Sequence, residues 1–227
     1  MEMEECLRKI KTIKICITML LIIYLIFDKN VHVSYGADKF SVYNDKTSSY
    51  RGVKTKLKKV ATVKGDGKGT KGKYPTRKGV ILVTSTGKLA NVVGHTAIIY
   101  SSGYVVEALK NGVAISRNNW KTKKANMAAV TVRNTTPKED AKVSDWCKKQ
   151  KNKKYNFDYY NTKTNKKYYC SQLIWAGYKN LLNIDLNTKA YDAKNKKAIG
   201  PYEFVRKSNS KVYPIYIKKW NRNDVTD

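Results

Sequence analysis

Histidine, cysteine and acidic residues are scarce in this chain. The 227 residues hold 2 His and 4 Cys, and 17 Asp and Glu stand against 46 Lys and Arg. The sequence has no CxxC or HxxxH pattern and no cluster of paired carboxylates, which are the patterns from which zinc sites are built. We therefore expect neither a metal nor an organic cofactor.

The chain also lacks an apolar run long enough for a comfortable membrane span. The run ICITMLLIIYLIF at Ile15–Phe27 follows four basic residues between positions 8 and 14. A transmembrane helix needs about 20 apolar residues, whereas the core of a signal peptide needs fewer. With the small residues Gly36 and Ala37, this pattern predicts a signal peptide over residues 1–37. An uncleaved membrane anchor is the alternative. In either case we expect residues 38–227 to be secreted or associated with the cell envelope.

The formal charge of +29 is scattered along the chain and hardly depends on the leader. Lys residues stand singly and in pairs in every segment, with Asn and Tyr between them. A protein this basic accumulates on polyanions, which outside a cell are anionic envelope polymers or lipid head groups. The scatter is typical of a solvated surface, so no specific nucleic-acid site is expected. The sequence does not indicate the oligomeric state.

Composition divides the part that follows the leader into two segments. Residues 38–74 are polar and irregular, and GDGKGTKGK at 65–73 is typical of a flexible surface loop. We predict a polar lead-in over 38–74 and one globular domain over 75–227. The apolar content of 41% argues against disorder and is sufficient for one core.

The domain begins with a series of predicted strands. GVILVTS, which starts at Gly79, has apolar residues on both faces and predicts a central strand. HTAIIY (95–100) and YVVEAL (104–109) predict a hairpin whose three-residue loop ends at Gly103 in the left-handed conformation. VAISR and NMAAVTVR predict two more strands. KVYPIYIKK (211–219) predicts a closing strand near a sheet edge, because Pro cannot donate to a ladder.

Two longer helices are predicted. Thr136-Pro137-Lys138-Glu139 is typical of a helix start, with Thr as N-cap and Glu closing a capping box. Cys147 falls on the apolar stripe of that helix, so we expect it to pack in the core. The second helix begins at Cys170. Its predicted apolar stripe comprises Leu173, Ile174, Gly177, Tyr178, Leu181 and Leu182. A shorter helix is expected after Gly200-Pro201.

Cys170, in YYCSQLIWAGY, is the candidate nucleophile. A thiol at a helix N-terminus lies where unpaired N–H groups and the helix dipole favour the thiolate. Two alternatives remain for the cysteine taken alone. It can be a small buried residue, or it can form a disulfide with Cys147, which would rule it out as a nucleophile.

His95 and Glu107 are the candidates for the other groups that a cysteine nucleophile needs. His95 is the only histidine after the leader, and Glu107 interrupts the apolar run of the next strand. The predicted loop pairs Tyr100 with Tyr104, which places His95 and Glu107 on one face as diagonal neighbours. A two-residue loop would place them on opposite faces. Glu107 can therefore orient the imidazole, or it can lie on a solvated face.

These motifs and their order resemble a known family. A hydrophobic strand with GHTAIIY and VVEA in the first half, and YYCSQLIWAGY in the second, is similar to the circularly permuted NlpC/P60 papain-like cysteine hydrolases, the YiiX/YebB-like branch. The resemblance covers roughly residues 75–215. It implies an α+β, permuted papain-like fold, in which an antiparallel central sheet packs against helices and the nucleophile lies at a helix N-terminus. It departs from the family at Gly79-Val80, where Gly-Asp is common, and at Tyr169, where unpermuted members carry Asp.

The resemblance also implies residue roles and a function. Cys170 would be the nucleophile, His95 the base and Glu107 the group that orients the imidazole. The implied function is that of a secreted cysteine hydrolase, which cleaves an amide or ester bond in a cell-wall peptide or another envelope substrate. One alternative is a lipid-directed acyltransferase or thioesterase with the same triad. The other is a non-catalytic, basic envelope-binding module.

Overall fold

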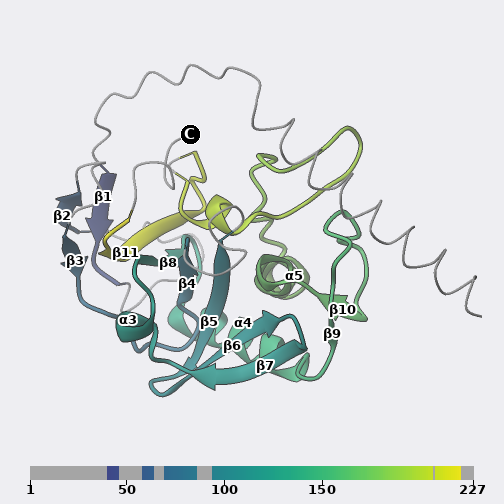
Figure 1. The fold of residues 1–227 in the computed structure, drawn as a ribbon. Coiled ribbons are helices and arrows are strands. Elements are labelled where there is room, and N and C mark those ends of the chain that lie inside the picture. The colour runs from purple at the N-terminus through teal and green to yellow at the C-terminus, as the bar shows by residue number, and fades with distance from the viewer. Residues whose placement is uncertain (1–39, 46–57, 64–68, 86–93, 207, 221–227) are drawn as a thin grey trace, which may run out of the picture. The chain divides into compact units, whose positions relative to one another are not determined.

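A seven-stranded sheet organises the chain in the computed structural model (Figure 1), which describes residues 40–45, 58–63, 69–85, 94–206 and 208–220. The elements in chain order are β1 (Phe40–Tyr43), β2 (Lys59–Val63), β3 (Thr70–Gly72), β4 (Ile81–Thr84), β5 (His95–Ser101), β6 (Tyr104–Leu109), β7 (Gly112–Arg117), α3 (Trp120–Lys123), β8 (Met127–Val132), α4 (Pro137–Lys149), β9 (Lys154–Tyr155), β10 (Lys167–Tyr168), α5 (Cys170–Leu182), η1 (Pro201–Phe204) and β11 (Val212–Lys218). The predicted leader over 1–37 lies outside the described residues.

The sheet has the strand order β3-β11-β8-β4-β5-β6-β7, and all of its neighbouring strands are antiparallel. The strand β4 lies at its centre, and its residues are buried on both faces. Ile81 and Val83 belong to one core cluster, and Leu82 belongs to the other. This position explains why GVILVTS has no polar face. The predicted α+β class and the antiparallel central sheet are confirmed.

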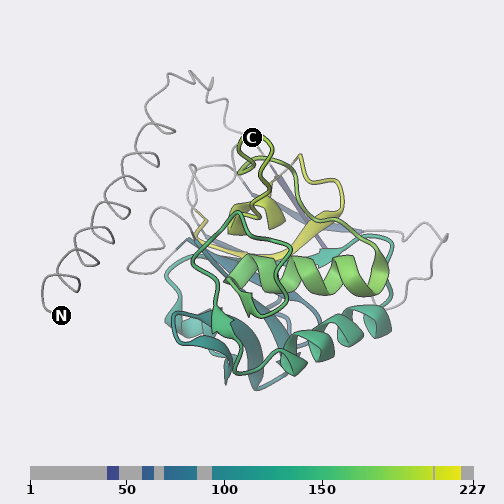
Figure 2. The same ribbon diagram turned by 90° about the vertical axis from the view of Figure 1, so that its right-hand side faces the viewer.

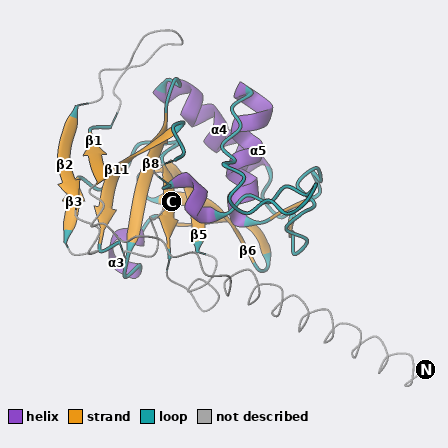
Figure 3. Ribbon diagram, turned by 90° about the horizontal axis from the view of Figure 1, so that it is seen from above, coloured by secondary structure: helices purple, strands orange, loops and turns teal. Residues whose placement is uncertain are grey.

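The two core clusters lie on opposite sides of the sheet. The helices α4 and α5 pack side by side over one face, against β5 and β6 (Figure 2). The short helix α3 lies at the other face, where Trp120 belongs to the second cluster (Figure 3). No helix within the described ranges has the length and apolar character needed to cross a bilayer.

The starts of both long helices are as predicted. Thr136 caps α4, because its hydroxyl accepts from the Glu139 N–H and the Glu139 carboxylate accepts from the Thr136 N–H at 2.8 Å. The helix α5 begins at Cys170. The predicted stripe of α5 is wrong in one respect, because Leu181 is 44% exposed. The last turn of α5 extends past the core. Asn183 then ends the helix in the left-handed conformation.

The turn of the β5–β6 hairpin differs from the prediction. Ser101 pairs with Tyr104, so the loop has two residues, and Gly103 does not adopt the predicted left-handed conformation. A bulge between Ile99 and Ser101 takes up the extra residue. Beyond the bulge Ile98 pairs with Val106, which is the predicted register. The bulge therefore keeps His95 and Glu107 on one face, although the loop is shorter than predicted.

The predicted polar lead-in contains regular structure. The strands β1 and β2 pair with each other, and Val42 is fully buried in the core. The expectation of a loop over 65–73 is wrong for Thr70–Gly72, which pairs with the end of β11. Backbone hydrogen bonds hold this edge strand while its side chains are exposed, so its sequence has no apolar pattern to reveal it. The strand β11 lies next to this edge, as Pro214 predicted.

Candidate active site

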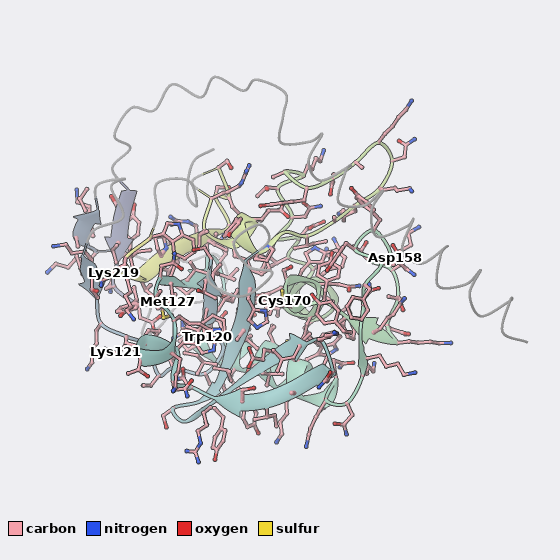
Figure 4. The ribbon with its side chains drawn as sticks, in the orientation of Figure 1. Trp120, Lys121, Met127, Asp158, Cys170 and Lys219 are labelled. Atoms are coloured by element: carbon pink, nitrogen blue, oxygen red, sulfur yellow. The ribbon has the colours of Figure 1, made fainter. Side chains whose placement is uncertain are left out.

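Cys170 lies at the first position of α5, between that helix and β5 (Figure 4). Its neighbour Tyr169 has an extended backbone, and the Tyr169 N–H donates to the Gln172 side chain at 3.2 Å. Only 6% of Cys170 is exposed. The sulfur is thus held at the end of the helix at which unpaired N–H groups gather.

His95 and Glu107 form a close pair on neighbouring strands. His95 is the first residue of β5, and its Nε2 lies 2.7 Å from Glu107 Oε2 on β6. Both side chains are largely buried, at 18% and 9% exposure. Because Nε2 faces the carboxylate, Nδ1 is the ring nitrogen left for Cys170. The structure therefore brings all three predicted site residues together.

The pKa of the His95 imidazole is raised and the pKa of the Cys170 thiol is lowered. Both changes favour an ion pair between the two side chains. Burial alone would lower the pKa of His95, but the hydrogen bond and charge of Cys170, followed by those of Glu107, raise it to about 9. Burial alone would raise the pKa of Cys170. The hydrogen bond and charge of His95 outweigh that effect, and donors from Thr96 add to it, so the pKa of the thiol is lowered. A thiolate facing an imidazolium is the reactive form of a cysteine nucleophile.

Glu107 has further partners that keep it ionised. Burial alone would raise the pKa of this carboxyl, but His95, a hydrogen bond from Ser116 and the charge of Lys124 lower it. Ser116 lies on β7, where Ala114 pairs with Glu107, so the serine is a diagonal neighbour on the same face. The carboxylate is thus fixed by side chains from β5, β7 and the segment after α3.

Trp120 covers the imidazole. The Trp120 ring stacks on His95 with centroids 5.7 Å apart and planes at 24°. Only 2% of Trp120 is exposed. Lys124 Nζ lies 4.9 Å from the centre of the indole. Figure 4 shows Trp120 and Cys170 on opposite sides of β5. The indole therefore leaves the ring of His95 little freedom to rotate away from Glu107.

Ser116, Trp120 and Lys124 were not predicted from the sequence. Ser116 interrupts the predicted strand VAISR, and the register of that strand against Glu107 was a signal that could have found it. Trp120 follows two asparagines and has no periodic apolar neighbours, so no pattern in the sequence places it against the histidine. Stacking between α3 and β5 arises only from the tertiary fold.

Tyrosine side chains lie near Cys170. Burial raises the pKa of Tyr155, and the charge of Cys170 adds to that rise, which places the phenol close to the sulfur. Tyr155 is half-buried and packs against the core, while its ring contacts Phe157 at 4.8 Å between centroids. Phe157 itself is 59% exposed. Tyr155 therefore packs against the core and lies near Cys170.

Cys147 and Cys170 are both free, so the alternative of a disulfide between them is excluded in this structure. Cys147 is fully buried on α4, and its thiol lies 3.7 Å from the carbonyl oxygen of Leu173. Burial raises the pKa of Cys147. The prediction that Cys147 packs in the core is confirmed, and burial favours the protonated form of its thiol.

Comparison with known proteins assigns the class and then the family. Residues 79–211 match the family of permuted papain-like amidase enzymes, YaeF/YiiX, C92 family. The protein is therefore an enzyme, a cysteine hydrolase of the amidase or peptidase type. The chain belongs to the C92 family of permuted papain-like amidases. The YiiX resemblance is confirmed, whereas the NlpC/P60 name is not part of the family's description.

One solved structure is similar to this chain. It is described as metalloprotein YiiX from Escherichia coli O157:H7, with 18% sequence identity over 50% of this chain and 70% of that one, at a TM-score of 0.42. Among the described residues of the present chain, no group of three or more His, Cys, Asp or Glu is arranged to hold a metal ion. No curated protein matches the chain at a significant level.

Proposed function

We propose that Cys170, His95 and Glu107 form the catalytic triad of this amidase. The observation that carries the proposal is the 2.7 Å contact of His95 Nε2 with Glu107, which leaves Nδ1 for the sulfur of a helix-terminal cysteine. In such a triad the thiolate attacks, the imidazole transfers protons and the carboxylate orients the imidazole. The carboxylate is a glutamate, held by Ser116 and Lys124.

The proposed reaction has two steps. The Cys170 thiolate attacks the carbonyl carbon of an amide, and the backbone N–H of Cys170 helps to hold the oxyanion. The C–N bond then breaks as His95 donates its Nδ1 proton to the departing amine, which leaves a thioester on Cys170. Water attacks this thioester while His95 takes the proton, and the carboxylic acid leaves as the thiolate returns.

The proposed setting is the cell envelope. The predicted leader over 1–37 and the net charge of +29 favour a secreted enzyme that is concentrated on anionic polymers or lipid head groups. An amide of a cell-wall peptide, or another envelope amide, is the substrate class that fits this setting. Binding to anionic vesicles that is absent from neutral vesicles, and that weakens as salt is added, is the expected result. Equal binding to both vesicle types would contradict the role of charge.

Turnover by matched cysteine variants tests the triad. The assay compares wild type, Cys170→Ala and Cys147→Ala on peptide amides, wall-peptide fragments, esters and phospholipids. Cys170→Ala should lose at least about a thousandfold in kcat. Cys147→Ala should lose stability because it opens a cavity, but the folded fraction should keep its turnover. Unchanged turnover by Cys170→Ala would overturn the proposal, and acyl transfer in preference to hydrolysis would replace the amidase reaction with an acyltransferase.

A further inference from the structure

Thr96 is a buried residue next to the catalytic histidine that the triad does not use. It is fully buried on β5, and its hydroxyl oxygen has no hydrogen-bond partner of normal geometry among the described residues. A buried hydroxyl without a partner destabilises the fold, and a valine of the same shape would avoid that cost. The presence of threonine here therefore calls for a physical reason.

The position of Thr96 on β5 directs its side chain toward α5. Successive side chains of a strand point to opposite faces, so Thr96 shares a face with Ile98, which belongs to the core cluster that contains Leu173 of α5. His95 occupies the opposite face with Trp120. At the start of β5, His95 therefore reaches Cys170 from one face of the strand, and Thr96 reaches it from the other.

Two groups of Thr96 reach the nucleophile. Both the backbone N–H and the hydroxyl of Thr96 lie near enough to the Cys170 sulfur to lower the pKa of its thiol. A thiol is a weak acceptor, which agrees with the absence of a normal hydrogen bond to the hydroxyl oxygen. A thiolate is a charged acceptor and draws donors closer. The hydroxyl is thus placed to donate a hydrogen bond to the sulfur once the sulfur is ionised.

We propose that Thr96 is a further residue of the catalytic machinery, whose hydroxyl and N–H donate to the Cys170 thiolate and hold it for attack. The proposal rests on the proposed function in taking Cys170 as the nucleophile. As the sulfur bonds to the substrate carbon its charge moves to the carbonyl oxygen, and the two donors of Thr96 release it. No bond to Thr96 forms or breaks.

Other ionisable groups near the sulfur also affect the pKa of Cys170. On β5 the charged group that faces Cys170 is His95. Glu107 on β6 helps to keep His95 protonated. The phenols of Tyr155, Tyr159 and Tyr169 face it from β9, the following loop and the N-cap of α5. Because their pKa values are raised, these phenols stay neutral and change little in the pH range of the thiol. The titration of Cys170 therefore reports chiefly on His95 and Thr96.

The test is the rate of Cys170 alkylation by iodoacetamide as a function of pH, resolved by residue with mass spectrometry in the full chain. This measurement needs no substrate, and buried Cys147 serves as the internal reference. Thr96→Val should raise the apparent pKa of the Cys170 thiol by at least about one unit, so alkylation below that pKa slows about tenfold. Thr96→Ser, which keeps the hydroxyl, should remain close to wild type.

Thr135→Val is the matched control. Thr135 is also buried, but its hydroxyl donates to Asp140 at 2.6 Å. This control should lower the free energy of unfolding and leave Cys170 reactivity unchanged. Thr96→Val should instead keep or raise stability, because it removes a hydroxyl that has no full partner. If Thr96→Val does not fold, Thr96→Ala takes its place, since it removes the same hydroxyl without added bulk.

The outcomes separate this inference from the proposed function. An acidic thiol in wild type that shifts upward in Thr96→Val but not in Thr96→Ser supports the role of Thr96. An acidic thiol that is equal in all three proteins overturns that role and leaves the triad intact. A wild-type Cys170 that titrates as an ordinary thiol overturns the triad and the role of Thr96 together.

Discussion

The imidazole of His95 lies against the indole of Trp120, with ring centroids 5.7 Å apart and an interplanar angle of 24°. At the edge of the same imidazole, Nε2 lies 2.7 Å from Oε2 of Glu107. One element, α3, therefore supplies the face that restrains the ring, while β6 supplies the group that orients it. The geometry of the site depends on a short helix that lies on the far side of the sheet from Cys170.

Replacement of Trp120 tests this restraint. Trp120→Leu removes the flat surface and should lower kcat about tenfold, because small displacements of a catalytic group are costly. Trp120→Phe keeps a flat ring and should lose much less. Steady-state kinetics at a temperature at which both variants are folded checks the prediction. A kcat for Trp120→Leu equal to that of Trp120→Phe would contradict a role for the stack.

Glu107→Gln tests the carboxylate. The amide keeps the shape but loses the negative charge that helps to raise the pKa of His95, so that pKa should fall. We expect kcat/KM to fall about a hundredfold, and the alkaline limb of its pH profile to move to lower pH. Glu139→Gln, which alters the cap of α4, serves as the control and should change stability only. A Glu107→Gln profile that keeps the wild-type alkaline limb would contradict the assignment.

The wild-type pH profile follows from the two shifted groups. Below the lowered pKa of Cys170 the thiolate is protonated, and above the His95 pKa of about 9 the imidazolium loses the proton that the leaving amine needs. Activity should therefore be level between these values and fall on either side. A profile of kcat/KM against pH measures both limits. An alkaline limb near the ordinary histidine value of about 6.5 would contradict the ion pair.

A buried carboxylate on α4 stabilises the fold through several hydrogen bonds. Asp140 on α4 is fully buried and accepts from Arg77 at 3.0 Å, Thr135 at 2.6 Å and Tyr178 at 3.1 Å. Asp140→Asn removes the charge that accepts these hydrogen bonds, although Arg77 keeps its pair with Asp45 at 2.8 Å, so the free energy of unfolding should fall by about 1.5–3 kcal/mol.

Another ion pair on the same helix provides the control for Asp140. Asp145 bonds Lys78 at 2.6 Å, but the Asp145 side chain is 47% exposed, so Asp145→Asn should cost less than about 1 kcal/mol. Urea unfolding of the two variants measures both values. Equal losses would show that burial does not determine the contribution of these pairs.

The three residues of the proposed triad could be predicted because each one departs from its local pattern. His95 is the only histidine after the leader, Glu107 interrupts an apolar strand, and Cys170 begins a helix. The register that unites the first two was predicted, but through a three-residue loop. The chain reaches the same register with a two-residue turn and a bulge, because bulges leave little trace in a sequence.

The remaining parts of the site depend on contacts between distant segments. Trp120 and Thr96 have no periodic signal that relates them to the nucleophile. The edge strand Thr70–Gly72 has exposed side chains and is held by its backbone, so composition alone indicates a loop. Leu181 matches the apolar period of α5, but the core ends one turn earlier. Sequence periodicity predicts which face is apolar and does not predict how far the neighbouring structure extends.

The pH dependence of Cys170 alkylation in wild type and His95→Gln tests the central claim most directly. The claim is that His95 converts Cys170 into a thiolate. Wild-type Cys170 should reach its full alkylation rate at a clearly lower pH than Cys170 in His95→Gln, which should titrate like an ordinary or buried thiol with a pKa of about 8.5 or above. Superimposable titrations of Cys170 in the two proteins would contradict the account.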